Sequence, residues 1–316
     1  MILVVTAAGL GLLGLPAAMR RVGRQLVPRH WALLCAVALL SGTVLVITTI
    51  LIIAAPRALE FVGLPAAARA CEHMLGGLYP GGTVVWFSAM ALGLSAAVLG
   101  TKAVVHAHRS VRRASIGSAA GTGMGRRGRF DIILMPDERT CAVSVPNGRR
   151  GGRVLLSRGL VDTLSSSELD AVCAHEMAHL RFSHQRYLVL AVLVEEAFWF
   201  WPPATRSTSA LRLALERWAD ESAAGDSSDI RQRLRSALLT VATVAPSPTL
   251  AAFSAMDGLM ERLHALDAQP GRTRLWAWLV LFAPGLLVGI AIAYATTRIG
   301  HQAYCFITMP GRCGSP

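Results

Sequence analysis

Two histidines, His175 and His179, stand four residues apart in the segment CAHEMAHLRFSH, and Glu176 directly follows the first. Residues i and i+4 lie one above the other on a helix, so both imidazoles can reach one tetrahedral metal ion at about 2.0–2.1 Å. Glu176 lies about 100° around the helix from His175, where it can face the open coordination position. Zinc lowers the pKa of its water to about 7, and a nearby carboxylate can then accept a proton. The pattern therefore predicts zinc-dependent hydrolysis, with His175 and His179 as ligands and Glu176 as general base.

A catalytic zinc ion needs a third protein ligand and keeps its fourth position open. The downstream candidates are Glu195, Glu196, Glu216 and Glu221. We favour Glu216, because Asp220 follows four residues later on a helical pattern and can accept the free N–H of a liganding histidine. Glu195 or Glu196 is the rival ligand, since ionisable residues in an apolar segment are functional candidates. A solvated, charged helix face is the alternative interpretation of Glu216 and Asp220.

His184 lies five residues beyond His179, off the predicted ligand face. We expect it behind the metal ligands or at the membrane interface. It is also one candidate for stabilising an oxyanion, together with Arg181 and backbone N–H groups.

Local signals predict the elements that carry these residues. The histidine helix is predicted to start after a cap at Ser165 or Ser166, with Glu168 or Leu169 in its first turn. Strand-like runs precede it at residues 130–136, 142–145 and 153–157, and the last two flank an Asn-Gly turn. The sequence therefore predicts a small hairpin or sheet beside the helix.

The composition favours a membrane protein. The 316-residue chain is 53% hydrophobic and has a mean hydropathy of +0.48. Predicted membrane spans cover residues 1–19, 31–55, 82–106 and 275–296. A shorter apolar stretch, 187–203, contains Glu195 and Glu196 and is predicted as a re-entrant, interfacial or buried helix. The net charge of +12 lies in arginine clusters without interleaved aromatic residues, which argues against nucleic-acid binding.

Positive residues orient the predicted spans. Arginines are concentrated between the first two spans and after the third, so these segments are predicted to be cytoplasmic and both termini outside the cell membrane. The predicted fold class is an α-helical multi-pass membrane protein, with about four transmembrane helices and a mainly α, zincin-like body carrying a small β-hairpin or sheet. The predicted order is a membrane domain (1–109), a basic flexible linker (110–129), a cytoplasmic zinc metalloprotease domain (130–274), a fourth span (275–296) and a short extracellular tail (297–316).

Taken together, these motifs resemble the BlaR/MecR-like family of membrane zinc metallopeptidases, of the HExxH gluzincin-like type. The chain is more distantly similar to the HtpX-like and prenyl-protein endopeptidases. The matching residues are Gly159-Leu160, Glu168-Leu169, His175 to His179, Phe198 to Pro202 and Glu216 to Asp220. The resemblance implies a zinc endopeptidase at the inner membrane face, and it implies that the 153–157 strand pairs with an extended substrate.

Two departures from that family qualify the resemblance. Its sensor members carry an extracellular penicillin-binding domain after the last span, whereas residues 297–316 follow it here, so we expect no antibiotic sensing by such a domain. The aromatic run also ends in Trp-Pro-Pro, which can alter the turn without touching the zinc ligands.

We therefore predict a multi-pass, Zn²⁺-dependent endopeptidase that acts on a protein or peptide substrate at the lipid bilayer, in signalling or regulated proteolysis. His175, His179 and Glu216 are its predicted ligands and Asp220 orients a ligand. The alternative is a non-catalytic membrane signalling or scaffold protein with a structural zinc. A structural site does not need Glu176, so the presence of that carboxylate favours the enzyme.

Overall fold

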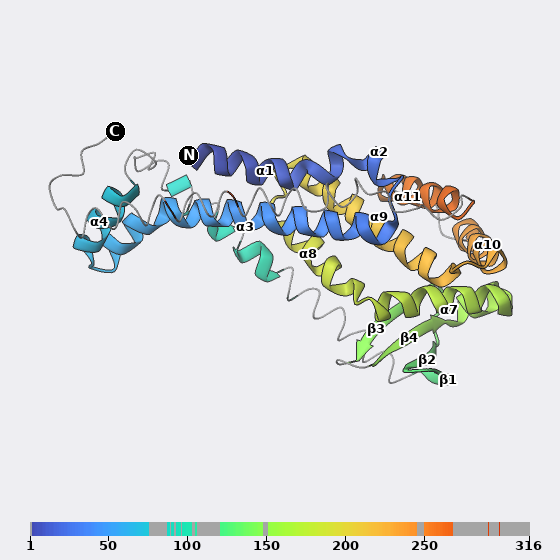
Figure 1. Cartoon of the computed structure of the whole chain (residues 1–316). Helices are drawn as coiled ribbons and strands as arrows, with labels where there is room; N and C mark the ends of the chain where they lie inside the picture. The colour runs from blue at the N-terminus through green and yellow to red at the C-terminus, as the bar shows by residue number, and fades with distance from the viewer. Residues whose placement is uncertain are drawn as a thin grey trace.

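The computed structural model describes residues 2–75, 121–147, 151–244 and 250–267, parts of 87–105, and residues 290 and 297. These residues are mainly helical, with one four-stranded sheet at one end of the molecule (Figure 1). The N-terminal helices are α1 (Ile2–Ala18), α2 (Arg20–Gly23), α3 (Pro28–Phe61) and α4 (Pro65–Leu75). The later helices are α6 (Arg158–Thr163), α7 (Ser166–Arg181), α8 (His184–Ala197), α9 (Pro202–Ala224), α10 (Ser228–Val244) and α11 (Leu250–Asp267).

Helices α1, α3 and α9 pack side by side although they are far apart in the sequence (Figure 1). Leu13 of α1, Leu39 of α3 and Leu211 of α9 are fully buried in their shared core. Glycines allow α1 and α3 to approach closely, since a Cβ added to Gly42 would lie 2.7 Å from the carbonyl oxygen of Gly9. Small residues at a helix contact are typical of packing inside a bilayer.

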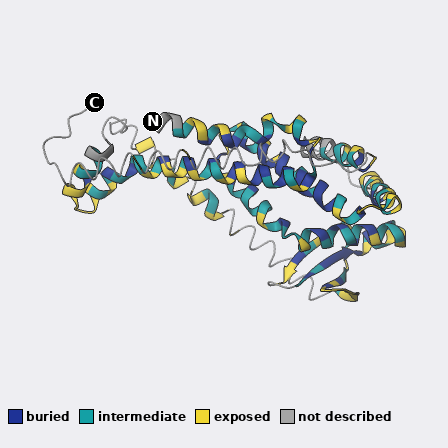
Figure 2. Cartoon of the chain, in the orientation of Figure 1, coloured by how far each residue is buried: buried dark blue, intermediate teal, exposed yellow. Residues whose placement is uncertain are grey.

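Among the described residues, α3 alone is long and apolar enough to cross a membrane, with 34 residues and a mean hydropathy of 2.6 in its most apolar window. It covers the predicted 31–55 span. Exposed residues recur along this helix (Figure 2), and its exposed large apolar residues include five at helical spacing: Val37, Leu40, Val44, Ile47 and Leu51. Helix α1 coincides with the predicted 1–19 span but has 17 residues. The predicted 82–106 span is described only in part, and its described residues are helical, whereas of 275–296 only residue 290 is described.

The four strands are β1 (Thr122–Arg127), β2 (Phe130–Met135), β3 (Ala142–Asn147) and β4 (Gly151–Ser157), in the order β1-β2-β4-β3. Strands β3 and β4 are antiparallel, as the predicted hairpin requires, whereas β2 and β4 are parallel. Ile132, Val154 and Leu156 form a buried cluster with Cys173 of α7, so the sheet packs against the helix that carries the histidines.

Two expectations about this region are wrong. Thr122–Arg127 form strand β1 although they fall within the predicted 110–129 linker, because their backbone pairs with β2 and Arg127 forms an ion pair with Asp170 of α7. Strand β4 lies between β2 and β3, so the 153–157 segment has no free edge for an extended substrate. In the described sheet the edge strand on that side is β3, which also contacts α7.

Side-chain caps start the two helices that follow the sheet. The Ser157 hydroxyl accepts a hydrogen bond from the Leu160 backbone N–H at the start of α6. Ser165 is the N-cap of α7 and forms a capping box with Glu168, which confirms the predicted start of the histidine helix. Between them, Gly159 donates its N–H to the carbonyl oxygen of Asp137 at 3.0 Å.

A substitution at Gly159 tests this junction. A Cβ at that position would lie 2.0 Å from the carbonyl oxygen of Glu138, so the backbone must move to accept it. We expect Gly159→Ala to destabilise the protein by about 1–3 kcal/mol, the usual cost of overpacking. The measurement is thermal unfolding of the detergent-solubilised protein, with Arg158→Ala, an exposed neighbour, as control. Equal melting temperatures for Gly159→Ala and the wild type would contradict the tight contact.

Candidate active site

Helix α7 presents His175 and His179 on one face, one turn apart. Their Nε2 atoms lie 3.1 Å from each other, so both rings direct the same nitrogen toward one point. The two side chains are nearly buried, with 9% and 11% of their surfaces accessible. The helical spacing thus produces the convergence that a shared metal ligand set requires.

Helix α9 packs against α7 and brings Glu216 to the same point. Its carboxylate oxygens lie 3.5 Å from Nε2 of His175 and 3.6 Å from Nε2 of His179. The three ligand atoms all lie within 4.8 Å of one another. Glu216 retains 36% of its side-chain accessibility, so the cluster opens to solvent on the side of this carboxylate.

The donor set fits zinc. Two imidazole nitrogens and one carboxylate leave a fourth tetrahedral position free, which is the arrangement of a catalytic zinc site. The charges also fit: three carboxylates, Glu176, Glu216 and Asp220, face one guanidinium, Arg262, and leave two negative charges for a divalent cation.

Asp220 and Arg262 lie behind the cluster. The Asp220 carboxylate, with 3% of its side chain accessible, lies 2.9 Å from Nδ1 of His175, on the ring edge away from Nε2. Arg262 of α11 donates two hydrogen bonds to Asp220, at 2.8 Å and 2.7 Å, and its third nitrogen lies 3.1 Å from Glu216. One guanidinium therefore holds both Glu216 and Asp220, and its bidentate geometry at Asp220 favours a fixed orientation.

His184 occupies the corresponding position behind His179. It begins α8 after Ser183, which has a left-handed backbone, and its side chain is fully buried. Its Nδ1 lies 3.0 Å from Nδ1 of His179, and its ring packs 4.6 Å from the Trp218 ring. His184 therefore lies on the buried side of His179, away from the solvent-facing side of the cluster.

The three histidines differ in pKa because their burial and their charged neighbours differ. Burial lowers the pKa of His175, but the Asp220 and Glu216 carboxylates outweigh it and raise the pKa to about 10. Burial and the neighbouring His175 lower the pKa of His179 to about 4, and burial and His179 lower that of His184 to about 3. The Asp220 carboxylate therefore favours a proton on His175, whereas the other two imidazoles stay neutral.

Glu176 lies next to His175 on α7 and faces β3. Burial raises the pKa of its carboxyl group above the ordinary value, and Ser144 of β3 hydrogen-bonds to it. Burial also opposes ionisation of Glu216, but its hydrogen bond with His175 and the nearby Arg262 hold the pKa of Glu216 well below its usual range. The raised pKa of Glu176 suits a proton acceptor, whereas the lowered pKa of Glu216 suits a carboxylate that stays ionised.

The rival carboxylates are engaged elsewhere. Glu195 pairs with Arg212 at 2.8 Å and accepts a hydrogen bond from Thr208. Glu221 forms an ion pair with Arg231 at 2.8 Å. Glu196 is exposed near the end of α8. None of these three belongs to the cluster around His175 and His179 in the described part of the chain.

Sequence reasoning missed two contributors to this site and underused a third. Arg262 lies 42 residues beyond Asp220, on a helix without a recognisable motif, so no spacing could connect them. Ser144 lies in the predicted hairpin, but its contact with Glu176 depends on how the sheet docks. His184 was expected behind the ligands or at the membrane interface, and its five-residue offset from His179 gave no specific partner.

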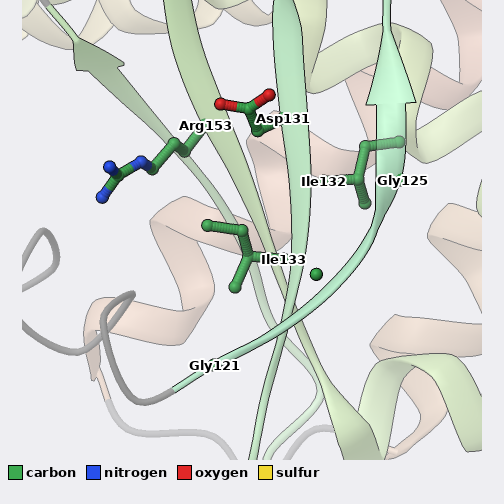
Figure 3. A pocket seen from close by; sticks show the side chains of 7 residues that line it. Gly121, Gly125, Asp131, Ile132, Ile133 and Arg153 are labelled. Atoms are coloured by element: carbon green, nitrogen blue, oxygen red, sulfur yellow. The ribbon is translucent and has the colours of Figure 1, made fainter.

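A shallow pocket on the sheet is separate from this cluster. It has a volume of about 540 Å³ and is lined by Asp131, Ile132, Ile133, Arg153 and the glycines at 121, 123 and 125 (Figure 3). Glycines 123 and 125 of β1 leave open space where side chains would stand. The lining contains one acidic side chain and no histidine or cysteine, so it offers no metal ligand set.

Comparison with known proteins supports the zinc chemistry. Residues 107–222 match the family model described as Peptidase family M48, and this range contains His175, His179 and Glu216. No curated protein and no solved structure matches the chain. The part of the chain that brings these three side chains together is therefore similar to Peptidase family M48, and it has the ligand set of a zinc metallopeptidase.

Proposed function

We propose that this protein is a membrane-anchored zinc endopeptidase that hydrolyses peptide bonds at the cytoplasmic membrane face. The observation that carries the proposal is the convergence of His175, His179 and Glu216 on one point, with Glu176 on the same helix. The match to Peptidase family M48 supports the reaction class. The long apolar helix α3 supports the membrane location.

In this proposal the residues divide the work of hydrolysis. His175, His179 and Glu216 would hold the zinc ion, which would supply acidification of a water molecule and polarisation of the scissile carbonyl. Glu176 accepts the proton of the attacking water, and its raised pKa makes it a better base than an exposed glutamate. The same carboxyl group then donates that proton to the leaving amine.

Residues behind the ligands keep them in the productive geometry. Asp220 accepts the Nδ1 proton of His175, which leaves Nε2 free as a ligand atom. His184, whose lowered pKa keeps it neutral, accepts the Nδ1 proton of His179 in the same way. Arg262 balances the charge of Asp220 and Glu216.

The substrate is proposed to approach along β3. This strand is the edge of the described sheet next to α7, and its Ser144 contacts Glu176. Pro146 lacks a backbone N–H and fits an edge strand, where not every donor is paired. An extended peptide that adds to β3 would pass the accessible side of Glu216.

Ion pairs support the predicted orientation. Arg20 and Arg24, which follow α1, lie 3.3 Å and 3.0 Å from Glu261 of α11. The first loop and the peptidase domain therefore share one side of any membrane that α1 and α3 cross. Because arginine-rich loops face the cytoplasm, we place the zinc site there and the N-terminus outside.

The four-span topology and the signalling role expected from the sequence are also part of this proposal. Spans at 82–106 and 275–296 would complete a four-span topology with the 297–316 tail outside. The BlaR/MecR-like resemblance further suggests that cleavage serves signalling or regulated proteolysis. The aromatic run at Phe198–Pro202, on which that resemblance partly rests, lies between α8 and α9, beside the bundle.

Replacing the proposed base tests the enzymatic role. We expect Glu176→Gln to keep zinc but to lower peptide cleavage at least about 100-fold, because the amide cannot accept the proton. The measurement is hydrolysis of casein or of a fluorogenic peptide by the detergent-solubilised protein, paired with zinc content. Glu138→Gln, an exposed glutamate after β2, is the matched control. Cleavage by Glu176→Gln at the wild-type rate would contradict the general-base role of Glu176, whereas a wild type that binds zinc without cleaving either substrate would favour the scaffold alternative.

Two substitutions of His184 distinguish a role in orienting the His179 ring from a role in core packing alone. We expect His184→Leu to weaken zinc affinity about 10–100-fold, the usual effect of removing a partner of a liganding histidine. His184→Asn should retain most of the affinity, since its side-chain oxygen can accept the His179 proton. Both values come from competition with a chromophoric chelator. Equal losses for the two variants would show that His184 serves packing alone.

A further inference from the structure

The turn between α8 and α9 carries aromatic residues that the chemistry does not use. We call residues 197–205, AFWFWPPAT, the aromatic tip. Trp199 is 68% exposed and Phe200 is 45% exposed, although both are large apolar residues. Neighbouring rings with such exposure mark a surface that has a partner.

The backbone holds these two rings outward. Phe198 is buried in the helical bundle and Trp201 packs against it, so the residues on either side of the exposed pair act as anchors. The Trp201 N–H donates to the Phe198 carbonyl at 2.8 Å, and the Ala204 N–H donates to the Trp201 carbonyl at 2.9 Å. Trp199 and Phe200 therefore cannot turn into the core without breaking this turn.

Contacts with α1 place the tip within the apolar part of the bundle. A Cβ added to Gly14 would lie 3.1 Å from Pro203, and the Ala17 N–H donates to the Ser207 hydroxyl at 3.0 Å. Gly14 stands six residues before Arg20, the first cation after α1, or about 9 Å along the helix. If Arg20 marks the depth of the lipid headgroups, the tip therefore lies deeper than the headgroups, on the hydrocarbon side.

Charged residues limit how far the tip can enter. Glu196 and Arg206 bound the tip, both are exposed, and no charged residue lies between them. Glu195 of α8 and Arg212 of α9 form an ion pair that neutralises two more charges. This pattern of a short apolar tip between charges fits the interfacial region, where Trp is enriched, and does not fit a full span.

We propose that the aromatic tip inserts into the cytoplasmic leaflet through Trp199 and Phe200 and forms an interfacial anchor for the peptidase domain. The partner is the lipid bilayer, since the tip lies against α1 at Gly14 and α1 packs on the long apolar helix α3. This inference rests on the membrane location in the proposed function. It adds a second contact, on the C-terminal side of the zinc motif, that holds the active site near the membrane surface.

Fluorescence quenching in a bilayer tests the inference. A fluorescent amino acid is placed at position 199 in the full chain, which is then reconstituted into nanodiscs of phosphatidylcholine and phosphatidylglycerol. Position 40 on α3 is the positive control and position 124 on β1 is the negative control; Leu40 and Met124 are 54% and 47% exposed. We expect quenching of position 199 by lipids with a shallow nitroxide, and a several-fold smaller iodide quenching constant than at position 124.

The outcomes separate the two claims. Iodide quenching at position 199 equal to that at position 124, with lipid quenching at position 40, overturns the anchor and leaves the membrane location intact. Iodide quenching at position 40 as well overturns the membrane location itself. Protection of position 199 from both quenchers shows that protein covers the tip, and this also overturns the anchor.

Discussion

The pairing of charges around His175 is the constraint on which the rest of the site depends. Asp220 is almost fully buried, lies 2.9 Å from His175 and accepts two hydrogen bonds from Arg262. A buried carboxylate without such partners would cost several kcal/mol, so α7, α9 and α11 must meet here. Glu216 stands one turn before Asp220 on α9, and the metal ligand set therefore depends on the same meeting of helices.

Helix α9 connects this chemistry to the proposed membrane. Its second half carries Glu216 and Asp220, whereas its first half packs against α1 and α3. Ser207, which accepts a hydrogen bond from α1, is nine residues from Glu216, or about 14 Å along one continuous helix. Helix α9 therefore fixes the distance between the zinc site and the apolar helices α1 and α3. The aromatic tip at the start of α9, once inserted in the lipid, would keep the site at that distance from the membrane.

Local spacing predicted much of the site. The offsets between His175 and His179 and between Glu216 and Asp220 reflect helical periodicity, and Ser165 with Glu168 is a local capping signal. Contacts between distant elements were not predictable in this way. Arg262 reaches the site because α11 docks on α9, and β1 forms because a neighbouring strand offers backbone partners to a glycine-rich segment. The family resemblance implied substrate pairing at β4, and the hairpin pattern did not reveal that β2 would cover that edge.

The zinc content of two variants of the same helix tests the central claim most directly. Glu216 and Glu221 are both carboxylates on α9, but only Glu216 belongs to the ligand cluster, whereas Glu221 pairs with Arg231. Elemental analysis of the purified full chain should find one zinc per molecule in the wild type and in Glu221→Gln, and little or none in Glu216→Gln after dialysis against a weak chelator. Full zinc retention by Glu216→Gln, or a wild type without zinc, would contradict the account.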